Sequence, residues 1–409
     1  MPIKLPDQMS TKIKILIISQ YFPPDISGGG TRAWNYAKCL SMKGFDVTVI
    51  TAFPHLHSDV PKKYKGKLTS TENLQGVKII RVWIPSLLHT SVKNRISLHT
   101  SFIFSSLLPL FTIKPDIIFA SEPNLFSIIP SYIYSKVKGG KVIRVVDDLW
   151  PEVIYERKYV KSKIFKKILD SLAKFSYTYP KCILPLTNEA KIHIQKTYDI
   201  NQNKVIVIEH GVDESVYHYK IKKRENEFVL MYSGAIVESY NFDLILEAAK
   251  KLKDKKIVFI IRGKGWLLKS IRESKEKHNL ENVIIDDKIV PFDQISEVLS
   301  KADAFLIPMK DEYTLNLSLP TKILEYQTLG RPIICCSLGA PGNYIKNTKS
   351  GIRLDYNNLD DFVETILELE KNVEKCKELG KNGRIFVEQN LTFEHIGNRL
   401  SKIIHDIMT

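Results

Sequence analysis

Short runs of β-branched and aliphatic residues alternate with longer amphipathic stretches along most of this chain. Such alternation is typical of parallel sheets whose strands are joined by crossover helices. A first series predicts strands at residues 13–19, 46–51, 77–82, 116–120, 141–146, 182–186 and 205–209. A second series predicts strands at 228–232, 257–261, 283–285, 304–307 and 332–335, and helices at 242–252, 264–277, 295–301 and 319–329. We therefore predict an α/β fold with two Rossmann-like, doubly wound domains in tandem.

The length of the chain agrees with this division. At 409 residues it exceeds the size at which a single hydrophobic core keeps growing. The stretch 219–227 carries charges of both signs without apolar periodicity, which predicts a linker. Ligands of open α/β sheets bind beyond the carboxyl ends of the strands, so two such domains predict a ligand-binding cleft between them.

The charge of the chain is strongly positive. Sixty Lys and Arg residues stand against 45 Asp and Glu, a formal net charge of +15. Nucleic acid, anionic lipid and phosphorylated ligands all fit this excess. The sequence contains no recognition-helix, zinc-finger or RRM signature, so we expect no nucleic-acid partner. Its five cysteines show no CxxC pairing or metal-ligand spacing, which predicts reduced thiols inside a cell.

Two apolar stretches bear on the question of a membrane. Residues 13–18 form a short apolar run that leads into a Pro/Gly-rich loop, so we interpret them as a strand and not as a signal peptide. Residues 96–113 are interrupted by His99 and Pro109. This second stretch predicts a buried or interfacial helix, and we expect no transmembrane span.

Three consecutive glycines, Gly28 to Gly30, follow the first predicted strand and precede a helix that carries Arg32. Glycine lets the backbone approach a ligand closely, and a helix start offers N–H groups to an anion or hydroxyl. A flexible turn entering a helix would explain the same residues. The spacing departs from GxGxxG, which disfavours a dinucleotide cofactor.

The segment 316–332 reads NLSLPTKILEYQTLGRP and predicts a helix that starts at a proline and stops at a glycine. Thr321 and Lys322 lie in its first turn, where N–H groups and the helix dipole favour phosphate. Glu325 follows on roughly the same face, where a carboxylate can accept hydrogen bonds from a ribose diol. An ordinary Lys–Glu surface pair is the alternative.

Four segments together resemble family 4 of the retaining glycosyltransferases, in the branch that builds surface polysaccharides and glycans on lipid carriers. They are YFPP with the glycines after it, DLWPE at 148–152, HGVD at 210–213, and residues 320–332. The last is similar to the family's Pro-Ser-Lys…Glu-Tyr…Gly-x-Pro segment and is the most diagnostic. The resemblance implies a GT-B fold with an acceptor-binding domain at 1–210 and a nucleotide-sugar-binding domain at 211–391. It also implies a final helix at 392–409 that packs back on the first domain.

The resemblance further implies a donor site in the second domain. Glu325 would bind the ribose, and Thr321 and Lys322 would lie near the diphosphate, with the glycine loop closing over from the first domain. The implied donor contacts are Gly29, Gly30, Arg32, Gly234, Arg262, Lys264, Pro320, Thr321, Lys322 and Glu325. Trp150 would lie on the acceptor side. We expect no metal or other cofactor, since the nucleotide sugar is a substrate and His55 and His57 form a pair without a third ligand.

The chain departs from the family pattern at three places. Leu317 stands where the family's long motif has a second Glu, and Ala235 and Tyr240 stand where many members hold the diphosphate with an Arg and a Lys. Two phosphates in a dry cleft need cationic or N–H partners. The cations available as substitutes are Lys322, Arg262, Lys264 and Arg32.

The third departure is Asp147, at the place of a His that many members aim at the transferred sugar. A carboxylate from Asp147 or its neighbour Asp148 could bind sugar hydroxyls or stabilise an oxocarbenium-like transition state. A helix or turn cap after a buried strand is the alternative for this pair. We expect Lys322 and helix N–H groups to stabilise the leaving diphosphate, so that no protein nucleophile is needed.

A basic amphipathic stretch, residues 157–174, bears on the acceptor. Apolar residues recur in it at helical spacing, and Lys163, Lys166 and Lys167 crowd other positions. Such a helix could rest on an anionic bilayer, or it could pack on the sheet with its lysines solvated.

The sequence leaves three functions open. The first is a glycosyltransferase that moves a sugar from a nucleotide-diphosphate sugar to a glycan or lipid-linked acceptor, cytoplasmic and peripheral to the membrane. The second is another GT-B enzyme, such as a nucleotide-sugar epimerase, which needs no lipid acceptor. The third is a binding subunit that kept the fold without catalysis, suggested by Leu317, Ala235 and Tyr240.

Overall fold

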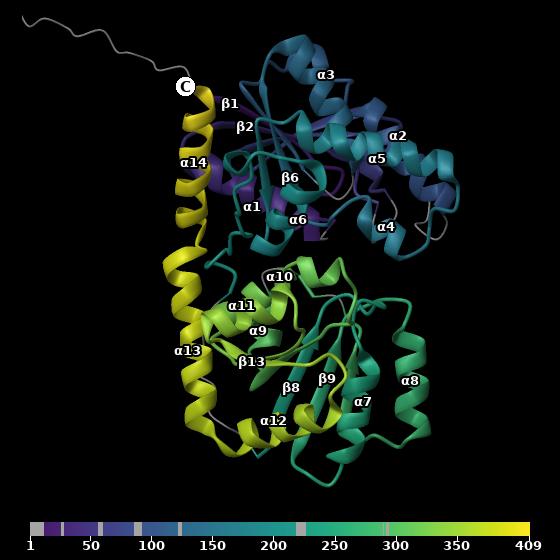
Figure 1. The fold of residues 1–409 in the computed structure, drawn as a ribbon, viewed down its shortest axis with the longest axis vertical. Helices are drawn as coiled ribbons and strands as arrows, with labels where there is room; N and C mark the ends of the chain where they lie inside the picture. The colour runs from purple at the N-terminus through teal and green to yellow at the C-terminus, as the bar shows by residue number, and fades with distance from the viewer. Residues whose placement is uncertain are drawn as a thin grey trace, which may run out of the picture. The chain divides into compact units, whose positions relative to one another are not determined.

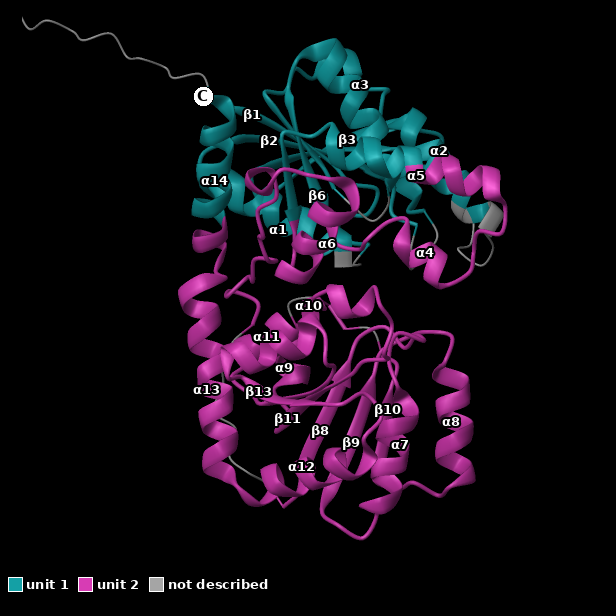
Figure 2. Cartoon of the chain, viewed as in Figure 1, with its two compact units in different colours: residues 1–146, 171–184, 397–409 teal, residues 147–170, 185–396 magenta. Residues whose placement is uncertain are grey.

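The chain contains two β-sheets, each accompanied by helices (Figure 1). The structure is a computed structural model, and it describes residues 12–25, 28–55, 60–85, 92–121, 125–217, 226–288, 290–291 and 294–409. Two compact units divide the chain (Figure 2). One comprises Met1–Val146, Ser171–Leu184 and Gly397–Thr409, and the other comprises Asp147–Asp170 and Pro185–Ile396.

The first unit is built around a seven-stranded sheet with the order β3-β4-β2-β1-β5-β6-β7. Strands β4, β2, β1, β5 and β6 pair in parallel, and β3 pairs antiparallel with β4. The strands are β1 Lys14–Ile18, β2 Asp46–Ala52, β3 Thr69–Leu74, β4 Val77–Val82, β5 Ile117–Ala120, β6 Lys141–Val146 and β7 Cys182–Pro185. The helices of this half of the sequence are α1 Gly28–Met42, α2 Val92–Ser105, α3 Ile128–Lys138, α4 Glu152–Glu156, α5 Lys163–Thr178 and α6 Asn188–Tyr198.

The second unit holds a six-stranded, wholly parallel sheet with the order β10-β9-β8-β11-β12-β13. Its strands are β8 Phe228–Ser233, β9 Ile257–Arg262, β10 Val283–Asp286, β11 Ala304–Pro308, β12 Ile333–Cys336 and β13 Gly351–Leu354. The helices that follow are α7 Phe242–Lys251, α8 Leu268–Lys277, α9 Ile295–Leu299, α10 Thr321–Thr328, α11 Ala340–Thr348, α12 Leu359–Lys371, α13 Val373–Asn390 and α14 Phe393–Met408.

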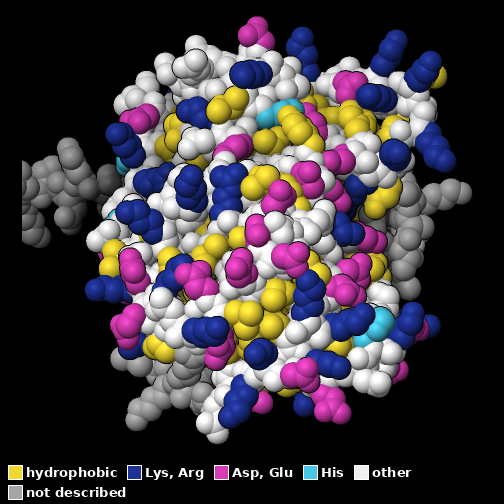
Figure 3. Space-filling view, turned by 60° about the horizontal axis from the view of Figure 1, so that its bottom comes forward, with side chains coloured by type: hydrophobic (Ala, Val, Ile, Leu, Met, Phe, Trp, Pro, Cys, Tyr) yellow, Lys and Arg dark blue, Asp and Glu magenta, His cyan; other side chains and the backbone are white. Residues whose placement is uncertain are grey.

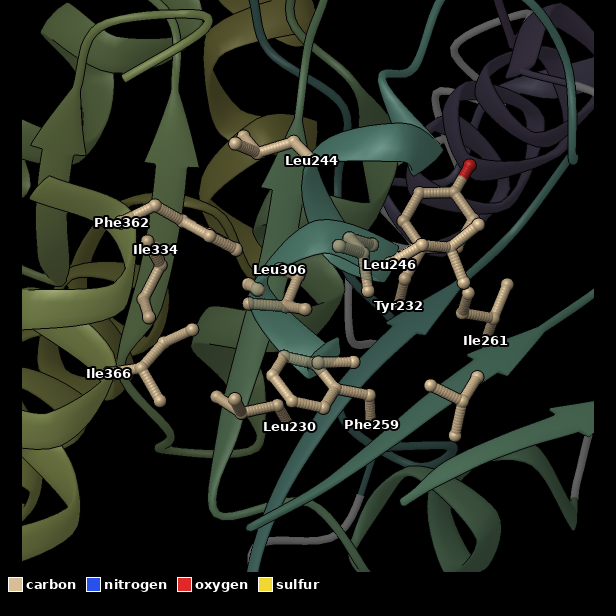
Figure 4. Close-up of a cluster of buried hydrophobic side chains, with 14 of the residues drawn as sticks. Leu230, Tyr232, Leu244, Leu246, Phe259, Ile261, Leu306, Ile334, Phe362 and Ile366 are labelled. Atoms are coloured by element: carbon tan, nitrogen blue, oxygen red, sulfur yellow. The ribbon is translucent and has the colours of Figure 1, made fainter. Parts of the chain in front are cut away.

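The central parallel strands of both sheets are buried and almost entirely apolar, as parallel strands covered by helices require. In the second unit, strand residues such as Phe259 and Leu306 pack against Leu244 of α7 and Phe362 of α12 (Figure 4). Tyr232 lies at the border of this cluster, and its hydroxyl points away from the apolar side chains. The packing of the core thereby places the Tyr232 hydroxyl at the carboxyl end of β8.

The predicted strands are confirmed to within one residue at each end, apart from residues 205–209. That prediction was wrong, because residues 206–210 form no ladder, although Ile208 N donates to Pro185 O at 3.0 Å. Val205 forms only an isolated bridge, and Val205 and Ile208 are buried without a ladder, so apolar spacing alone misled. The predicted helices are also present, and α8 begins at Leu268, four residues later than expected. Most of the predicted linker lies outside the described residues.

Candidate active site

Polar groups gather at the carboxyl ends of β8 and β9, where the two following loops touch. Gly234 N donates to Arg262 O at 3.0 Å, and Ile236 N donates to Lys264 O at 2.8 Å. A Cβ atom on Gly263 would overlap Gly234 O, and Gly263 has φ +141. Glycine is needed there for both reasons. The backbone contact fixes the loop that carries Gly234 beside the start of α10.

Helix α10 begins with Pro320 as its N-cap, and Thr321 and Lys322 are its first residues. The first N–H groups of a helix lack acceptors within the helix and favour an anion. Buried His210 places Nε2 3.3 Å from Thr321 Oγ1. The HGVD segment thus supports the same helix start, a contact that the sequence did not predict.

The Lys322 ammonium lies between two tyrosine rings. Its Nζ donates to Tyr232 Oη at 2.8 Å and lies 4.1 and 4.0 Å from the ring centroids of Tyr232 and Tyr240. The Tyr232 hydroxyl donates in turn to Ala235 O at 2.5 Å, which directs its lone pairs toward Lys322. A Cβ atom at Gly234 would overlap Nζ. Burial lowers the pKa of Lys322 to about 7, against the opposing effect of Glu325.

Glu325 lies one turn further along α10 and is partly buried. The Tyr217 hydroxyl hydrogen-bonds its carboxylate. Burial raises the pKa of Glu325 from its usual value, and Tyr217 and Lys322 act in the opposite direction. Lys322 and Glu325 form no ion pair with each other in the part of the chain that the structure describes. The alternative of an ordinary surface pair therefore does not fit, because Lys322 turns to the tyrosines.

Asp148 contributes a carboxylate to this region of the second unit. It keeps a solvent-exposed surface, but the surrounding protein and the charge of Asp147 raise its pKa to about 6, against the effect of Arg157. The charge of Asp148 also contributes to the raised pKa of Tyr240. Asp148 is therefore an electrostatic neighbour of the ring that holds Lys322.

Helix α4, which follows Asp148, is anchored at both ends. Glu152 accepts hydrogen bonds from His193 Nε2 and Tyr198 Oη, both at 2.9 Å. Glu156 accepts from Tyr313 N at 2.5 Å and from the N and Oγ1 of Thr314 at 3.0 and 2.6 Å. The Glu152 contacts hold the end of the DLWPE segment, which also carries partly buried Trp150, against α6, and the Glu156 contacts hold α4 against the loop that leads into α10.

The other implied cations have different surroundings. Arg262 Nε lies 3.2 Å from Asp286 Oδ2, and its Nη2 donates to Lys288 O at 2.9 Å. This buried guanidinium therefore braces the ends of β9 and β10, and the geometry does not support its assignment to the diphosphate. Lys264 is exposed in the loop after β9 and stays a candidate.

Arg32 was expected to substitute for a missing cation, and the geometry gives it another task. Its side chain is completely buried, donating from Nη1 to Val146 O at 2.9 Å and from Nη2 to Leu184 O at 3.0 Å. Nε and Nη2 also contact Tyr36 Oη. Arg32 ties α1 to the ends of β6 and β7. Gly29 and Gly30 lie at the start of α1, and their contact with a donor stays a prediction.

We expect Arg32→Met to destabilise the fold while leaving nucleotide affinity unchanged. Removing the guanidinium strands two buried carbonyl groups, at a cost of about 3 kcal/mol. Thermal melting should report a decrease of roughly 6–12 °C. A loss of nucleoside diphosphate affinity in protein that remains folded would instead restore Arg32 to the donor site.

The positions of departure are filled by apolar or aromatic groups. Leu317 ends the 3-10 helix Leu315–Leu317, and its carbonyl accepts from Thr187 Oγ1 at 2.6 Å. An alkyl chain therefore replaces the carboxylate of the family. Tyr240 supplies a ring for Lys322 where many members have a second cation. Asp147 is partly buried beside Asp148, and its role stays a prediction.

Helix α5 carries the predicted membrane lysines. Lys163, Lys166 and Lys167 are exposed, and so are Ile164 and Ile168 between them. The interpretation of a helix packed on the sheet holds for its later residues, such as Leu169, which is buried. The first half of α5 thus presents apolar and basic side chains together.

The described helices and polar clusters bear on the remaining expectations. None of the described helices combines the length and apolar content that crossing a bilayer requires. Within the described residues, no three His, Cys, Asp or Glu side chains form a group that could hold a metal ion. The expectation of a reaction without a cofactor stays a prediction, and His57 lies outside the described residues.

Two family models match adjoining parts of the chain. One is described as glycosyltransferase family 4 and matches residues 26–216, and the other is described as glycosyl transferases group 1 and matches residues 213–386. The chain belongs to the family 4 glycosyltransferases. The resemblance found in its motifs is confirmed, and with it the transferase class.

Named relatives agree with this membership. An uncharacterized glycosyltransferase from Methanocaldococcus jannaschii is 28% identical over 207 residues, which cover 49% of this chain and 55% of the relative. The UDP-Gal:alpha-D-GlcNAc-diphosphoundecaprenol alpha-1,3-galactosyltransferase of Escherichia coli is 25% identical over 224 residues, 51% of this chain and 56% of that protein. The chain thus spans about half the length of these two relatives.

A solved structure confirms the fold. Sucrose-phosphate synthase from Thermosynechococcus elongatus has a TM-score of 0.78 at 13% identity, over 97% of this chain and 99% of that one. The family 4 chain accordingly has the predicted GT-B fold with two Rossmann-like sheets. The domain boundaries at 210 and 391 stay a prediction.

Proposed function

We propose that this family 4 protein is a retaining glycosyltransferase. It transfers a sugar from a nucleoside diphosphate sugar to a hydroxyl of a glycan or lipid-linked acceptor at the cytoplasmic face of a membrane. The observation that carries the proposal is the start of α10, with Lys322 held above Gly234 and Glu325 one turn behind it. The Escherichia coli relative, named for a UDP-galactose donor and a diphosphoundecaprenol acceptor, supports these substrate classes by analogy.

The donor would lie across the first turn of α10. Helix N–H groups and the Lys322 ammonium would bind the diphosphate, and Glu325 would accept hydrogen bonds from the ribose hydroxyls. A dianionic ligand favours the charged form of Lys322 and so raises its pKa from about 7. The phosphate would replace Tyr232 as a partner of the ammonium, with the tyrosine rings still beneath it.

The transfer can proceed without a protein nucleophile. The bond between the anomeric carbon and the diphosphate oxygen breaks, and the acceptor oxygen bonds to the same face of the sugar. The acceptor's proton passes to the departing phosphate. Lys322 and the helix N–H groups stabilise the charge that develops on the leaving group. The Asp148 carboxylate supplies negative charge for the oxocarbenium-like transition state.

The two perturbed groups predict a bell-shaped pH dependence of kcat/KM. Asp148 is active when ionised, above its pKa of about 6, and Lys322 is active when protonated, below its pKa of about 7. Since kcat/KM reports the free enzyme, the rate should be highest between these values and decrease on both sides. A profile that stays level from pH 5 to pH 9 would exclude both assignments. Lys322→Arg, if it folds and is active, should lack the decrease on the basic side.

The first half of α5 is a proposed contact with an anionic membrane. Lys166→Glu with Lys167→Glu should weaken binding to vesicles that contain phosphatidylglycerol by at least about thirtyfold, since each basic residue contributes about 1 kcal/mol near such a surface. Co-sedimentation measures the effect. The matched control is Lys253→Glu with Lys255→Glu, two exposed lysines after α7. Equal binding by both double variants would remove α5 from the membrane contact.

One assay separates the three candidate functions. Purified protein is incubated with a panel of nucleoside diphosphate sugars, with and without lipid-linked acceptor, and the released nucleotide and modified sugar are measured. A transferase releases nucleoside diphosphate in proportion to glycosylated acceptor. An epimerase changes the sugar without acceptor, and a binding subunit does neither. Either of the last two results overturns the proposal.

A further inference from the structure

The segment from α2 through the 3-10 helix η2 (Leu110–Thr112) has two apolar faces. Its inner face, with Leu98, Phe102 and Leu110, is buried in the core of the first sheet. Its outer face leaves large apolar side chains in solvent. They are Ile96, Phe104, Leu108 and Phe111, which are 46%, 68%, 49% and 82% exposed. The inner face alone accounts for the packing of this segment.

The exposed side chains follow helical spacing. Ile96, Phe104, Leu108 and Phe111, with exposed Thr100 between the first two, recur every three or four residues. We call this set the outer stripe. Ile96 and Phe104 lie on α2, about 12 Å apart at the rise of a helix, and Leu108 and Phe111 follow in the turn and the 3-10 helix after it. Several large apolar side chains left exposed along one segment indicate a place where a protein meets a partner or a membrane.

The segment that carries the outer stripe contains basic residues and no acidic ones. The sequence contains no Asp or Glu between residues 73 and 115 or between residues 128 and 146. Exposed Lys114 follows η2, and Lys136 is exposed at the end of α3. Lys138 Nζ lies 5.1 Å from the ring centroid of Phe111. By contrast, acidic and basic side chains are interspersed on the face that Figure 3 shows.

This charge selects among the possible occupants. Two copies of the chain that met through the outer stripe would bring the lysines beside it, Lys114, Lys136 and Lys138, toward those of the other copy, which opposes association. An anionic bilayer offers acyl chains to the aromatic rings and phosphates to the lysines. We propose that the outer stripe docks the first unit on an anionic membrane, with Phe104, Leu108 and Phe111 among the lipids at headgroup depth.

The inference rests on the proposed function only for its purpose, which is to bring a soluble catalytic unit to a lipid-linked acceptor. The outer stripe shares no residue with the basic first half of α5. It also accounts for the apolar stretch 96–113, which is too interrupted for a span but suits an element that is half core and half interface.

The test compares two triple variants of the full chain. One is Phe104→Ser, Leu108→Ser and Phe111→Ser. The control is Met42→Ser, Leu68→Ser and Ile192→Ser, which removes three exposed apolar side chains elsewhere. Binding to vesicles of phosphatidylcholine, with and without phosphatidylglycerol, is measured by co-sedimentation. The stripe variant should lose at least tenfold in binding to the anionic vesicles, and the control should bind like the parent. Equal binding by the stripe variant and the parent overturns the proposal.

Further variants keep the test decisive if the serine variant misfolds. With phosphatidylglycerol vesicles, the tryptophan fluorescence of Phe111→Trp should contain a blue-shifted contribution that the parent lacks. If that contribution is absent, the stripe does not insert. Lys114→Glu, Lys136→Glu and Lys138→Glu should reduce binding to anionic vesicles without changing melting. A parent dimer that the serine substitutions convert to monomers, with vesicle binding retained, would identify a second copy as the occupant.

Failure of this inference is distinguishable from failure of the proposed function. Nucleoside diphosphate binding, measured by thermal shift, should be the same in the stripe variant and the parent. A parent that binds anionic vesicles but no nucleotide would refute the transferase proposal and leave the docking surface standing. A parent that binds nucleotide but not vesicles would refute the docking surface and leave the transferase proposal standing.

Discussion

Lys322→Met is expected to lower kcat/KM by about 10²–10³-fold while leaving the fold intact. The ammonium belongs to a residue in the first turn of α10, and many family members share this task with an Arg and a Lys at the positions of Ala235 and Tyr240. With no cation at either place, Lys322 carries more of the charge that develops on the leaving phosphate. Steady-state transfer to a lipid-linked acceptor measures the effect.

The matched control for this variant is Lys269→Met on α8, an exposed lysine of the same unit. It should transfer sugar at the rate of the parent. Melting temperatures should show that both variants fold. If Lys322→Met is as active as Lys269→Met, the leaving group is stabilised by other residues, and the mechanism given above is wrong.

Glu325→Gln is expected to weaken binding of a nucleoside diphosphate by about 10–100-fold. The substitution keeps the shape of the side chain but exchanges a charged acceptor for a neutral one, and hydrogen bonds to charged groups contribute about 1.5–3 kcal/mol. Isothermal titration measures the affinity. The control is Glu364→Gln on α12, an exposed carboxylate that should leave affinity unchanged.

Deoxynucleotides sharpen this test. If Glu325 binds the ribose, the parent should prefer a ribonucleoside diphosphate over its 2′- or 3′-deoxy form, and the Gln variant should lose most of that preference. Removing either partner of one hydrogen bond has the same consequence, so the two changes should not add. Fully additive losses would mean that Glu325 acts on another part of the ligand.

Local patterns predicted the fold because buried strands need apolar runs wherever they lie. The strand at 141–146 is reproduced to the residue for this reason. Strand β3 was missed because Thr69–Leu74 is polar and pairs antiparallel at the sheet edge, without an apolar run. Residues 205–209 failed in the opposite direction, since they are apolar and partly buried beside the end of β7 without forming a ladder with it.

The candidate site was predictable where its residues share one helix. Helical spacing placed Lys322 and Glu325 on one face, and the structure places them one turn apart on α10. The tyrosine rings around Lys322 come from β8 and the loop after it, far away in sequence. The role of Arg32 was not predictable for the same reason. Its side chain points inward because it donates to carbonyl groups of β6 and β7, which lie far away in sequence.

The most direct measurement is a crystal structure with the nucleoside diphosphate that a thermal-shift screen selects. We predict phosphate oxygens at the N–H groups of Thr321 and Lys322, the Lys322 ammonium on a phosphate, and ribose hydroxyls within hydrogen-bonding distance of Glu325. A nucleotide bound away from residues 320–326 would contradict the account.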